Sequence, residues 1–136
     1  MENSKPDNLL FMDFLENYNQ AFYDKDINKL KDFYDSAGSV LIYFDNHKNN
    51  DTFCLEDHLR LISDFFKNGK ATESGKVEPI SIENLHIFSK TDSACLCFIV
   101  RYQSFPVPAV RATMYLERIG GTWKILHVHC SFEPEK

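Results

Sequence analysis

Two histidines near the carboxyl end of the chain have a spacing that could support chemistry. His127 and His129 are two residues apart, so on a β-strand both rings would leave the same face. Such a pair could polarise a carbonyl, transfer a proton or bind a metal ion. A structural pair, hydrogen-bonded beneath the sheet or at a subunit contact, explains the same spacing, and the pattern leaves both interpretations open.

An arginine with two hydroxyl-bearing residues forms a second candidate group. Arg111 precedes Thr113 and Tyr115 at intervals of two, which places all three on one face of a strand. A guanidinium beside a hydroxyl and a phenol could hold a carboxylate by two parallel hydrogen bonds. Arg101 is a further candidate for this role. The alternative is that both arginines are exposed, or lie at an interface, and pair with acidic side chains.

Tyr43 and Asp45 could form the acid–base pair of an enzyme. A carboxylate or imidazole base together with a tyrosine can move a proton next to a carbonyl group. Asp45 follows Tyr43 at strand spacing, and His129 is another candidate base. These three residues are therefore the candidates for catalysis. Asp45 also begins the polar segment 46–51, where a solvated aspartate in a turn is ordinary, and this alternative stays open.

The cysteines do not have the spacing of a metal site. Cys95 and Cys97 would face one way on a strand, and the two-residue gap of structural zinc knuckles is absent. Cys130 follows His129 directly, so their side chains point to opposite faces. We expect no metal and no cofactor. The sequence also contains no glycine-rich phosphate loop, serine elbow or cysteine–histidine nucleophile motif, which argues against nucleotide hydrolysis and acyl transfer.

Composition favours one soluble domain. The chain has 136 residues, of which 43% are hydrophobic and 26% charged, as is typical of a globular domain. Fifteen basic and twenty acidic residues give a net charge of −5, and without a basic stripe neither nucleic acid nor an anionic membrane is an expected partner. There is no apolar run of about 18 residues to span a membrane, and we expect no secretory leader. These features predict a cytoplasmic protein with reduced thiols.

The first half of the chain is expected to form three helices. Apolar residues recur every four positions from Leu9 to Phe22, which predicts an amphipathic helix, capped by Asp7 or Asn8, after a disordered tail of residues 1–7. A second helix, capped by Asp26, has its apolar side chains at positions 27, 30, 33 and 34. A third helix is expected over residues 55–67. Its apolar side consists of Leu55, Leu59, Ile62 and Phe66.

The remaining segments predict β-strands. Residues 40–45 form a short β-branched and aromatic run, and from residue 75 onward the hydrophobic period is two. Four long strands are expected over residues 76–90, 94–105, 109–119 and 122–133, joined by turns at 91–93, 105–108 and 120–121. Helices followed by a meander of strands indicate one domain of the α+β class over residues 1–136.

The segment from Arg111 to Ser131 resembles the last hairpin of two related families. Its sequence RATMYLERIGGTWKILHVHCS is similar to the SnoaL-like and the calcium/calmodulin-dependent protein kinase II association-domain families, and residues 84–95 are also similar to the kinase hub. The resemblance implies the cone-shaped nuclear transport factor 2-like (cystatin-like) fold, with three N-terminal helices against a strongly bent, mostly antiparallel sheet and a pocket between them. It also implies association through the sheet, as a homodimer or a larger ring.

The resemblance leaves two functions in competition. Arginines on the kinase hub strands can hold a carboxylate, but the matching positions here are Val100, Met114 and Cys130, so that anion site is not transferred. The first function is binding of a small molecule in a mainly apolar pocket, with cofactor-independent isomerase, cyclase or dehydratase activity of the ketosteroid-isomerase type as its enzymatic form. The second is an oligomerisation module without catalytic activity. The candidates for lining the pocket are Tyr43, Arg101, Arg111, Thr113, Tyr115, Trp123, His127 and His129.

Overall fold

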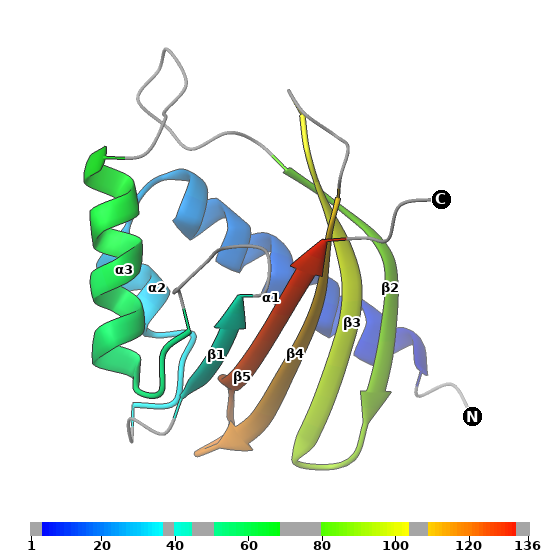
Figure 1. The fold of residues 1–136 in the computed structure, drawn as a ribbon. Helices are drawn as coiled ribbons and strands as arrows, with labels where there is room; N and C mark the ends of the chain where they lie inside the picture. The colour runs from blue at the N-terminus through cyan, green and yellow to red at the C-terminus, as the bar shows by residue number, and fades with distance from the viewer. Residues whose placement is uncertain (1–3, 37–39, 45–50, 69–79, 104–108, 133–136) are drawn as a thin grey trace.

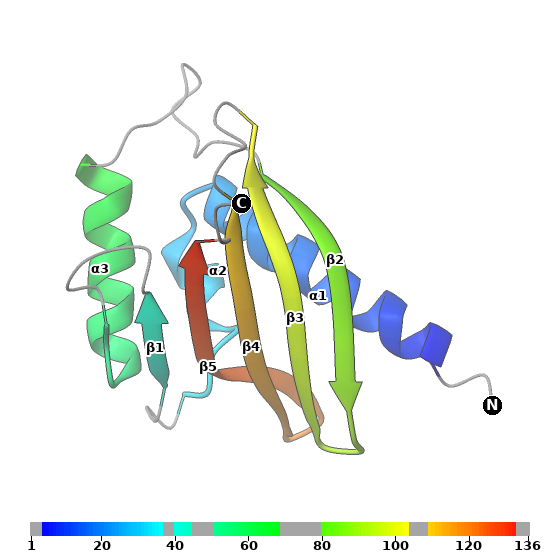
Figure 2. The same ribbon diagram turned by 45° about the vertical axis from the view of Figure 1, so that its right-hand side comes forward.

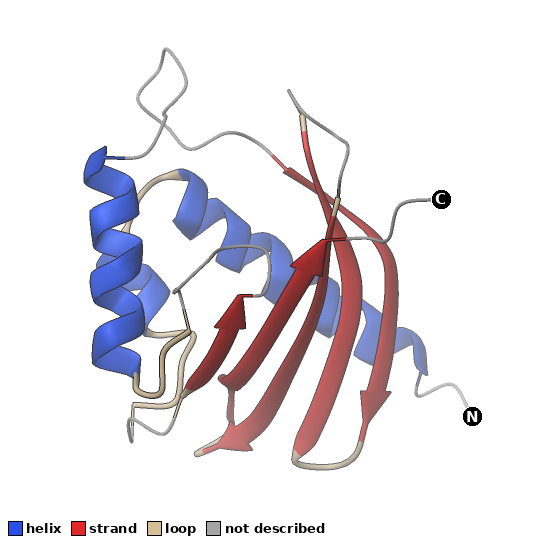
Figure 3. Ribbon diagram, viewed as in Figure 1, coloured by secondary structure: helices blue, strands red, loops and turns tan. Residues whose placement is uncertain are grey.

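Three helices and five strands make up the part of the chain described by a computed structural model, residues 4–36, 40–44, 51–68, 80–103 and 109–132. Helices and strands are segregated as expected of an α+β domain (Figures 1 and 3). The elements in chain order are α1 (Ser4–Tyr23), α2 (Ile27–Lys31), β1 (Leu41–Phe44), α3 (Leu55–Asn68), β2 (Ile80–Ser89), β3 (Ser93–Tyr102), β4 (Val110–Ile119) and β5 (Thr122–Phe132).

The five strands form one mixed sheet in the order β1-β5-β4-β3-β2. β1 runs parallel to β5, while each of the other neighbouring pairs is antiparallel. The predicted meander therefore forms most of the sheet, and the short strand is added at its edge beside the last strand. The long strands curve together in Figures 1 and 2, which confirms the expected bent and mostly antiparallel sheet.

α1 begins earlier than the hydrophobic pattern suggested. The helix starts at Ser4, so residues 4–7 are helical, and only residues 1–3 of the expected tail lie outside the described part. Asp7 and Asn8 are inside the helix, and the prediction that one of them caps it is wrong. Pro6 falls in the first turn, where a missing N–H removes no helical hydrogen bond.

α2 begins where predicted and ends earlier. Asp26 is its N-cap, and a side-chain oxygen accepts a hydrogen bond of 3.1 Å from a backbone N–H of the first turn. The residues after the helix are bound to β5 instead: the N–H of Asp35 donates to the carbonyl of Ile125 at 3.0 Å, and the N–H of Ile125 donates to that of Phe33 at 2.8 Å. These bonds place Tyr34 against the sheet.

The sheet has one face covered by helices and one bare face. Along β4, Ala112, Met114 and Leu116 are buried. They belong to the same core cluster as Phe11 and Leu15 of α1. In Figures 1 and 2, α1 crosses behind the sheet, and no described helix lies on the side turned toward the viewer. We call the covered side the inner face and the bare side the outer face.

Two glycines form the turn between β4 and β5. Gly120 and Gly121 have φ angles of +60° and +81°, the left-handed pair that a tight hairpin turn uses. A Cβ atom at either position would meet nothing within 4 Å. The backbone conformation, rather than lack of space, therefore selects glycine here, and the turn brings Arg118 opposite Trp123.

Candidate functional site

Seven of the eight residues predicted to line a pocket lie together on the outer face. Tyr43 pairs with His129 and His129 pairs with Thr113, so these side chains form a row across β1, β5 and β4. His127 and Tyr115 form the neighbouring row. The seven are Tyr43, Arg101, Arg111, Thr113, Tyr115, His127 and His129.

This placement differs from the expected one. The residues were expected in a pocket between the sheet and the helices, but the alternation of the strands turns them away from the helices. The side chains of β4 and β5 that face the helices are instead Met114, Val128 and Cys130, all of them buried. The register of the strands decides which side chains face the helices, because a shift of one residue would exchange the outer set with the buried set. A ligand-binding role for the outer residues stays a prediction.

Tyr43 lies between the two histidines of the predicted pair. Its ring centroid is 5.8 Å from that of His127 and 6.0 Å from that of His129, and both contacts are edge-to-face. His127 Nδ1 lies 2.8 Å from the carbonyl oxygen of Leu41, so this nitrogen is the donor. His129 is exposed. The two rings share a face as predicted, and they lie beside a phenol on an open surface.

Acidic side chains of the protein already bind two of the residues that were predicted to hold a carboxylate. Arg101 Nε donates to Glu83 Oε1 at 2.9 Å. The hydroxyl of Tyr115 donates to Glu117 at 2.7 Å, and this hydrogen bond raises the pKa of Tyr115. Arg111 is exposed and shares its face with Tyr115, as the spacing predicted. Of the two predicted arginines, Arg111 is thus the one more open to an external anion.

Only part of the predicted acid–base pair falls within the described residues. Asp45 lies outside them, while Tyr43 and His129 lie on the outer face.

Cys95 and Cys97 are free thiols on the outer face as well. Burial, followed by the neighbouring thiol of Cys97, raises the pKa of Cys95. Across the described ranges, no three side chains of His, Cys, Asp or Glu come together as a metal-binding group.

The interior holds three hydrogen-bonded side chains that the sequence analysis did not single out. The hydroxyl oxygen of Tyr34 lies 2.5 Å from that of Tyr18 and 2.9 Å from His58 Nε2. Tyr34 and His58 are only 1% and 2% exposed, and Tyr18 is half-buried. Tyr18 comes from α1, His58 from α3, and Tyr34 from the segment after α2. We call these three residues the interior triad.

Packing as well as hydrogen bonding positions the triad. The ring of Tyr34 makes edge-to-face contacts with the ring of Tyr18, at 6.0 Å, and with that of His58, at 5.2 Å. Tyr34 is also bridged to Ile125 of β5. The middle hydroxyl is therefore held by two aromatic neighbours and by the backbone contact with the sheet.

Burial keeps all three groups of the triad uncharged at neutral pH. It raises the pKa of Tyr18 to about 12 and that of Tyr34 well above its ordinary value, and it lowers the pKa of His58 to about 4. The phenols keep their protons, and the neutral imidazole has one protonated and one unprotonated nitrogen. If His58 donates to Tyr34, the hydroxyl of Tyr18 is left to donate outward. With the opposite tautomer, the oxygen of Tyr18 is left to accept.

The sequence contains a signal for the triad. Tyr18 lies on the four-residue stripe of the first helix and Tyr34 on the apolar side of the second. His58 is three residues after Leu55 and four before Ile62, so it interrupts the apolar side of the third helix. A polar ring at such a position indicates a buried hydrogen bond. Helical periodicity does not say which rings of different helices meet.

Thr52 adds a buried hydroxyl to the inner face. Its backbone makes two hydrogen bonds of 2.9 Å with Ile42, so the two side chains share a face, and Ile42 is in the core. Thr52 is 6% exposed, and its Oγ1 has no hydrogen-bond partner among the described residues. A buried polar atom of this kind ordinarily bonds to water, a ligand or another part of the chain.

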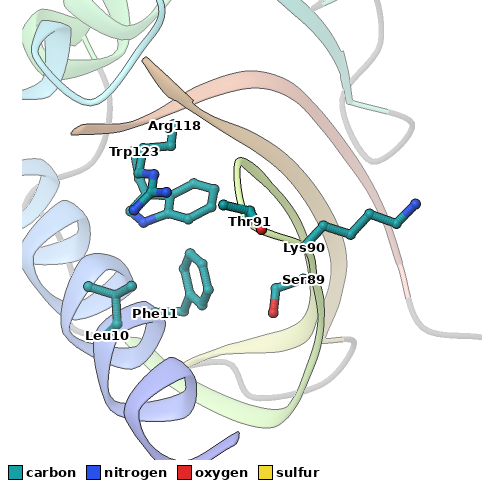
Figure 4. A pocket seen from close by; sticks show the side chains of 7 residues that line it. All are labelled: Leu10, Phe11, Ser89, Lys90, Thr91, Arg118 and Trp123. Carbon is teal, nitrogen blue, oxygen red and sulfur yellow. The ribbon is translucent and has the colours of Figure 1, made fainter. Parts of the chain in front are cut away.

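Trp123, the eighth predicted pocket residue, lines a groove at one end of the inner face (Figure 4). The groove has a volume of about 510 Å³. α1 contributes Leu10 and Phe11, the end of β2 and the turn after it contribute residues 89–91, and the hairpin of β4 and β5 contributes Arg118 and Trp123. Trp123 is therefore separated from the other predicted residues by the thickness of the sheet.

A match to a family profile identifies the family of this chain. The profile of the SnoaL-like domain matches residues 12–134, nearly the whole chain. The chain belongs to the SnoaL-like domain family. No curated protein matches this SnoaL-like domain. None of its described helices has the length and apolar character needed to cross a bilayer.

Solved structures share the nuclear transport factor 2-like fold of this SnoaL-like domain. A nuclear transport factor 2-like protein of unknown function from Pseudomonas putida is 18% identical, with a TM-score of 0.75 over 96% of this chain and 89% of its own. A candidate calcium/calmodulin-dependent protein kinase II association domain from Xanthomonas campestris is 18% identical, with a TM-score of 0.67 over 90% and 85%. A candidate ketosteroid isomerase from Shewanella frigidimarina is 17% identical, with a TM-score of 0.66 over 86% and 90%. Identities this low show the fold alone.

Proposed function

We propose that this SnoaL-like domain binds an uncharged small molecule through an oxygen atom, between the helices and the sheet. The observation that supports the proposal is the interior triad. Polar groups in a core are costly unless they are hydrogen-bonded. Tyr34 uses its hydroxyl for both neighbours, which leaves the hydroxyl of Tyr18 at one end of the triad with bonding capacity for a further partner.

The chemistry around Tyr18 defines the kind of ligand. Its hydroxyl can donate to a carbonyl or accept from a hydroxyl, depending on the tautomer of His58. The ring of Phe33 packs edge-to-face on those of Tyr18 and Phe14, with centroid distances of 5.5 and 5.3 Å. These aromatic neighbours favour a ligand with a flat apolar body. Since all three groups of the triad are uncharged at neutral pH, nothing in it would compensate the desolvation of a charged ligand.

Binding, rather than turnover, is the function that the described residues support. His58 is a weak base because burial lowers its pKa to about 4, and its Nε2 is hydrogen-bonded to Tyr34. Proton transfer of the ketosteroid-isomerase type is the catalytic form of the proposal. It would require another base, and the sequence candidates are Asp45, which lies outside the described residues, and His129, which lies on the outer face.

Two matched probes test the proposal by calorimetry. 2-Naphthol and 2-methylnaphthalene have the same ring system, but only the first has an oxygen. We expect the wild-type protein to bind 2-naphthol at least about tenfold more tightly, and Tyr18→Phe to lose about tenfold for 2-naphthol alone. Tyr115→Phe, on the outer face, is the control. Equal affinity of the wild-type protein for both probes, or no effect of Tyr18→Phe, would contradict the proposal.

Assembly through the outer face is the second candidate function, and the bare sheet favours it. Phe53 and Phe88 are 70% and 67% exposed. Phe53 contacts Tyr43 at one edge of the sheet, and Phe88 pairs with Cys95 at the other. Exposed aromatic side chains are more frequent at protein interfaces than on the rest of a protein surface. A homodimer through this face is the expected assembly, and the candidate kinase association domain from Xanthomonas campestris shares the fold.

A further inference from the structure

We infer that the groove beside Trp123 is a separate ligand site, for an organic monoanion with a flat apolar body. Its volume of about 510 Å³ is within the range of small-molecule sites, roughly 300–1,000 Å³. The groove lies where α1 passes the ends of two hairpins (Figure 4). One side is apolar and aromatic, and the other has polar and cationic side chains.

Trp123 and Leu10 give the apolar side its exposed surface, while the ring of Phe11 is only 1% exposed. Phe11 and Trp123 pack edge-to-face with their centroids 5.1 Å apart. Leu10 lies beside them and is 44% exposed. A ligand ring against this surface would remove apolar area from water at both Leu10 and Trp123.

Arg118 supplies the positive charge nearest to the rings. Its guanidinium carbon is 5.8 Å from the centroid of the Trp123 ring. Nε and Nη2 donate to the same oxygen of Asp92, at 3.1 and 3.0 Å. A guanidinium has five N–H donors, so this contact leaves donors for a second carboxylate. Stacking on an aromatic ring while binding an anion is a property of arginine that lysine lacks.

The local charge favours an anion although the protein as a whole is acidic. Lys90 and Arg118 contribute two positive charges and Asp92 contributes one negative charge, which leaves +1 at a groove on a chain of net charge −5. Lys90 extends away from the rings in Figure 4, so it adds to the field without covering the groove. The site also differs from the interior triad, which is uncharged, and the inference does not depend on the proposed function.

The single tryptophan of the chain makes the site directly observable. The sequence contains one Trp, so a ¹H–¹⁵N NMR spectrum has one indole signal, from Trp123. The probes are 3-phenylpropionate and its uncharged analogue 3-phenylpropanamide. We expect 3-phenylpropionate to shift the indole signal in a saturable manner, and the amide to bind at least about tenfold more weakly.

Two substitutions in the same ion pair separate anion binding from a structural role. Arg118→Gln removes the cation, so the preference for 3-phenylpropionate over the amide should disappear. Asp92→Asn removes the competing carboxylate, so 3-phenylpropionate should bind several-fold more tightly. If the ion pair only maintained the shape of the groove, both variants would bind the probe more weakly. Arg60→Gln, which removes an exposed cation on α3, is the control and should leave binding unchanged.

Three results would overturn the inference. They are a lack of any saturable indole shift, equal affinity for the acid and the amide, and weakened binding in Asp92→Asn. Tyr18→Phe should bind 3-phenylpropionate as the wild-type protein does. This variant distinguishes failure of the groove site from failure of the interior site, which is tested with the naphthalene probes.

Discussion

The hydroxyl oxygens of Tyr18 and Tyr34 lie 2.5 Å apart, although the two residues are sixteen positions apart, one in α1 and the other in the segment after α2. Tyr18 packs against both core clusters, the larger one beneath the sheet and the smaller one around Leu30 and Ile62. The hydrogen bond between Tyr18 and Tyr34 therefore lies where these two clusters meet. The packing of the helices and the candidate binding site depend on the same side chains.

Tyr34→Phe should destabilise the fold. It removes the hydroxyl that bonds both Tyr18 and His58, so two polar groups in the interior lose a partner. We expect the free energy of unfolding to fall by about 1–3 kcal/mol, measured by urea denaturation. Tyr115→Phe removes a hydroxyl on the outer face and should change it by no more than about 0.5 kcal/mol. An equal effect of the two variants would contradict the structural role of the triad.

His58 should make stability depend on pH. Its pKa is about 4 in the folded protein, against an ordinary value of 6.5. Below pH 6.5 the unfolded chain therefore takes up a proton that the folded protein takes up only near pH 4. The stability that this group confers is complete above pH 6.5 and is lost as the pH falls toward 4, by at most about 3 kcal/mol.

The comparison with His58→Gln isolates this contribution from those of the other titrating groups. Unfolding is measured in urea at pH 7.5, 6 and 5 for both proteins. The difference between wild type and variant should shrink as the pH falls. If the two stability curves stay parallel over this range, His58 is not buried in its neutral form.

Thr113→Asp tests assembly through the outer face. Thr113 is half-buried and pairs with Cys97 on one side and His129 on the other, near the middle of the sheet. In a two-fold symmetric dimer every substitution occurs twice across the interface, so the new carboxylates should weaken association at least about tenfold. Sedimentation velocity measures this, with Asn17→Asp on α1 as the control. A monomeric wild-type protein at micromolar concentration would rule out the dimer.

Gly121→Ala should cost about 1 kcal/mol of stability. The residue has φ +81°, and a Cβ atom would meet nothing within 4 Å, so the cost comes from the backbone conformation alone. Gly121→Asn should cost less, because asparagine tolerates positive φ better than alanine does. Urea denaturation of both variants checks the order, and an alanine variant as stable as wild type would show that the turn is not left-handed.

Hydrophobic periodicity predicted the elements of this domain and missed two helix ends. The start of α1 was wrong because Asp7 and Asn8 are good capping residues, yet the helix tolerates Pro6 in its first turn and begins at Ser4. The end of α2 depends on backbone hydrogen bonds between residues 33–35 and Ile125. No local pattern contains information about a partner that is about ninety positions away.

The candidate site was predicted less well than the fold. Period-two spacing correctly grouped Arg111, Thr113 and Tyr115 on one face. On β4 the opposite face consists of Val110, Ala112, Met114 and Leu116, so the alternation already favoured that apolar face as the one that the helices cover. The triad was missed because Tyr18 and His58 lie on apolar sides of helices and their meeting depends on how the helices pack.

The most direct test of the interior site is ¹⁵N NMR of the histidine side chains during titration with 2-naphthol. The chain has five histidines, and the spectrum of His58→Gln identifies the signals of His58. We predict that 2-naphthol shifts the imidazole nitrogens of His58 and leaves those of His127 and His129 unchanged. Shifts at His127 and His129 with none at His58 would place binding on the outer face and contradict the interior site.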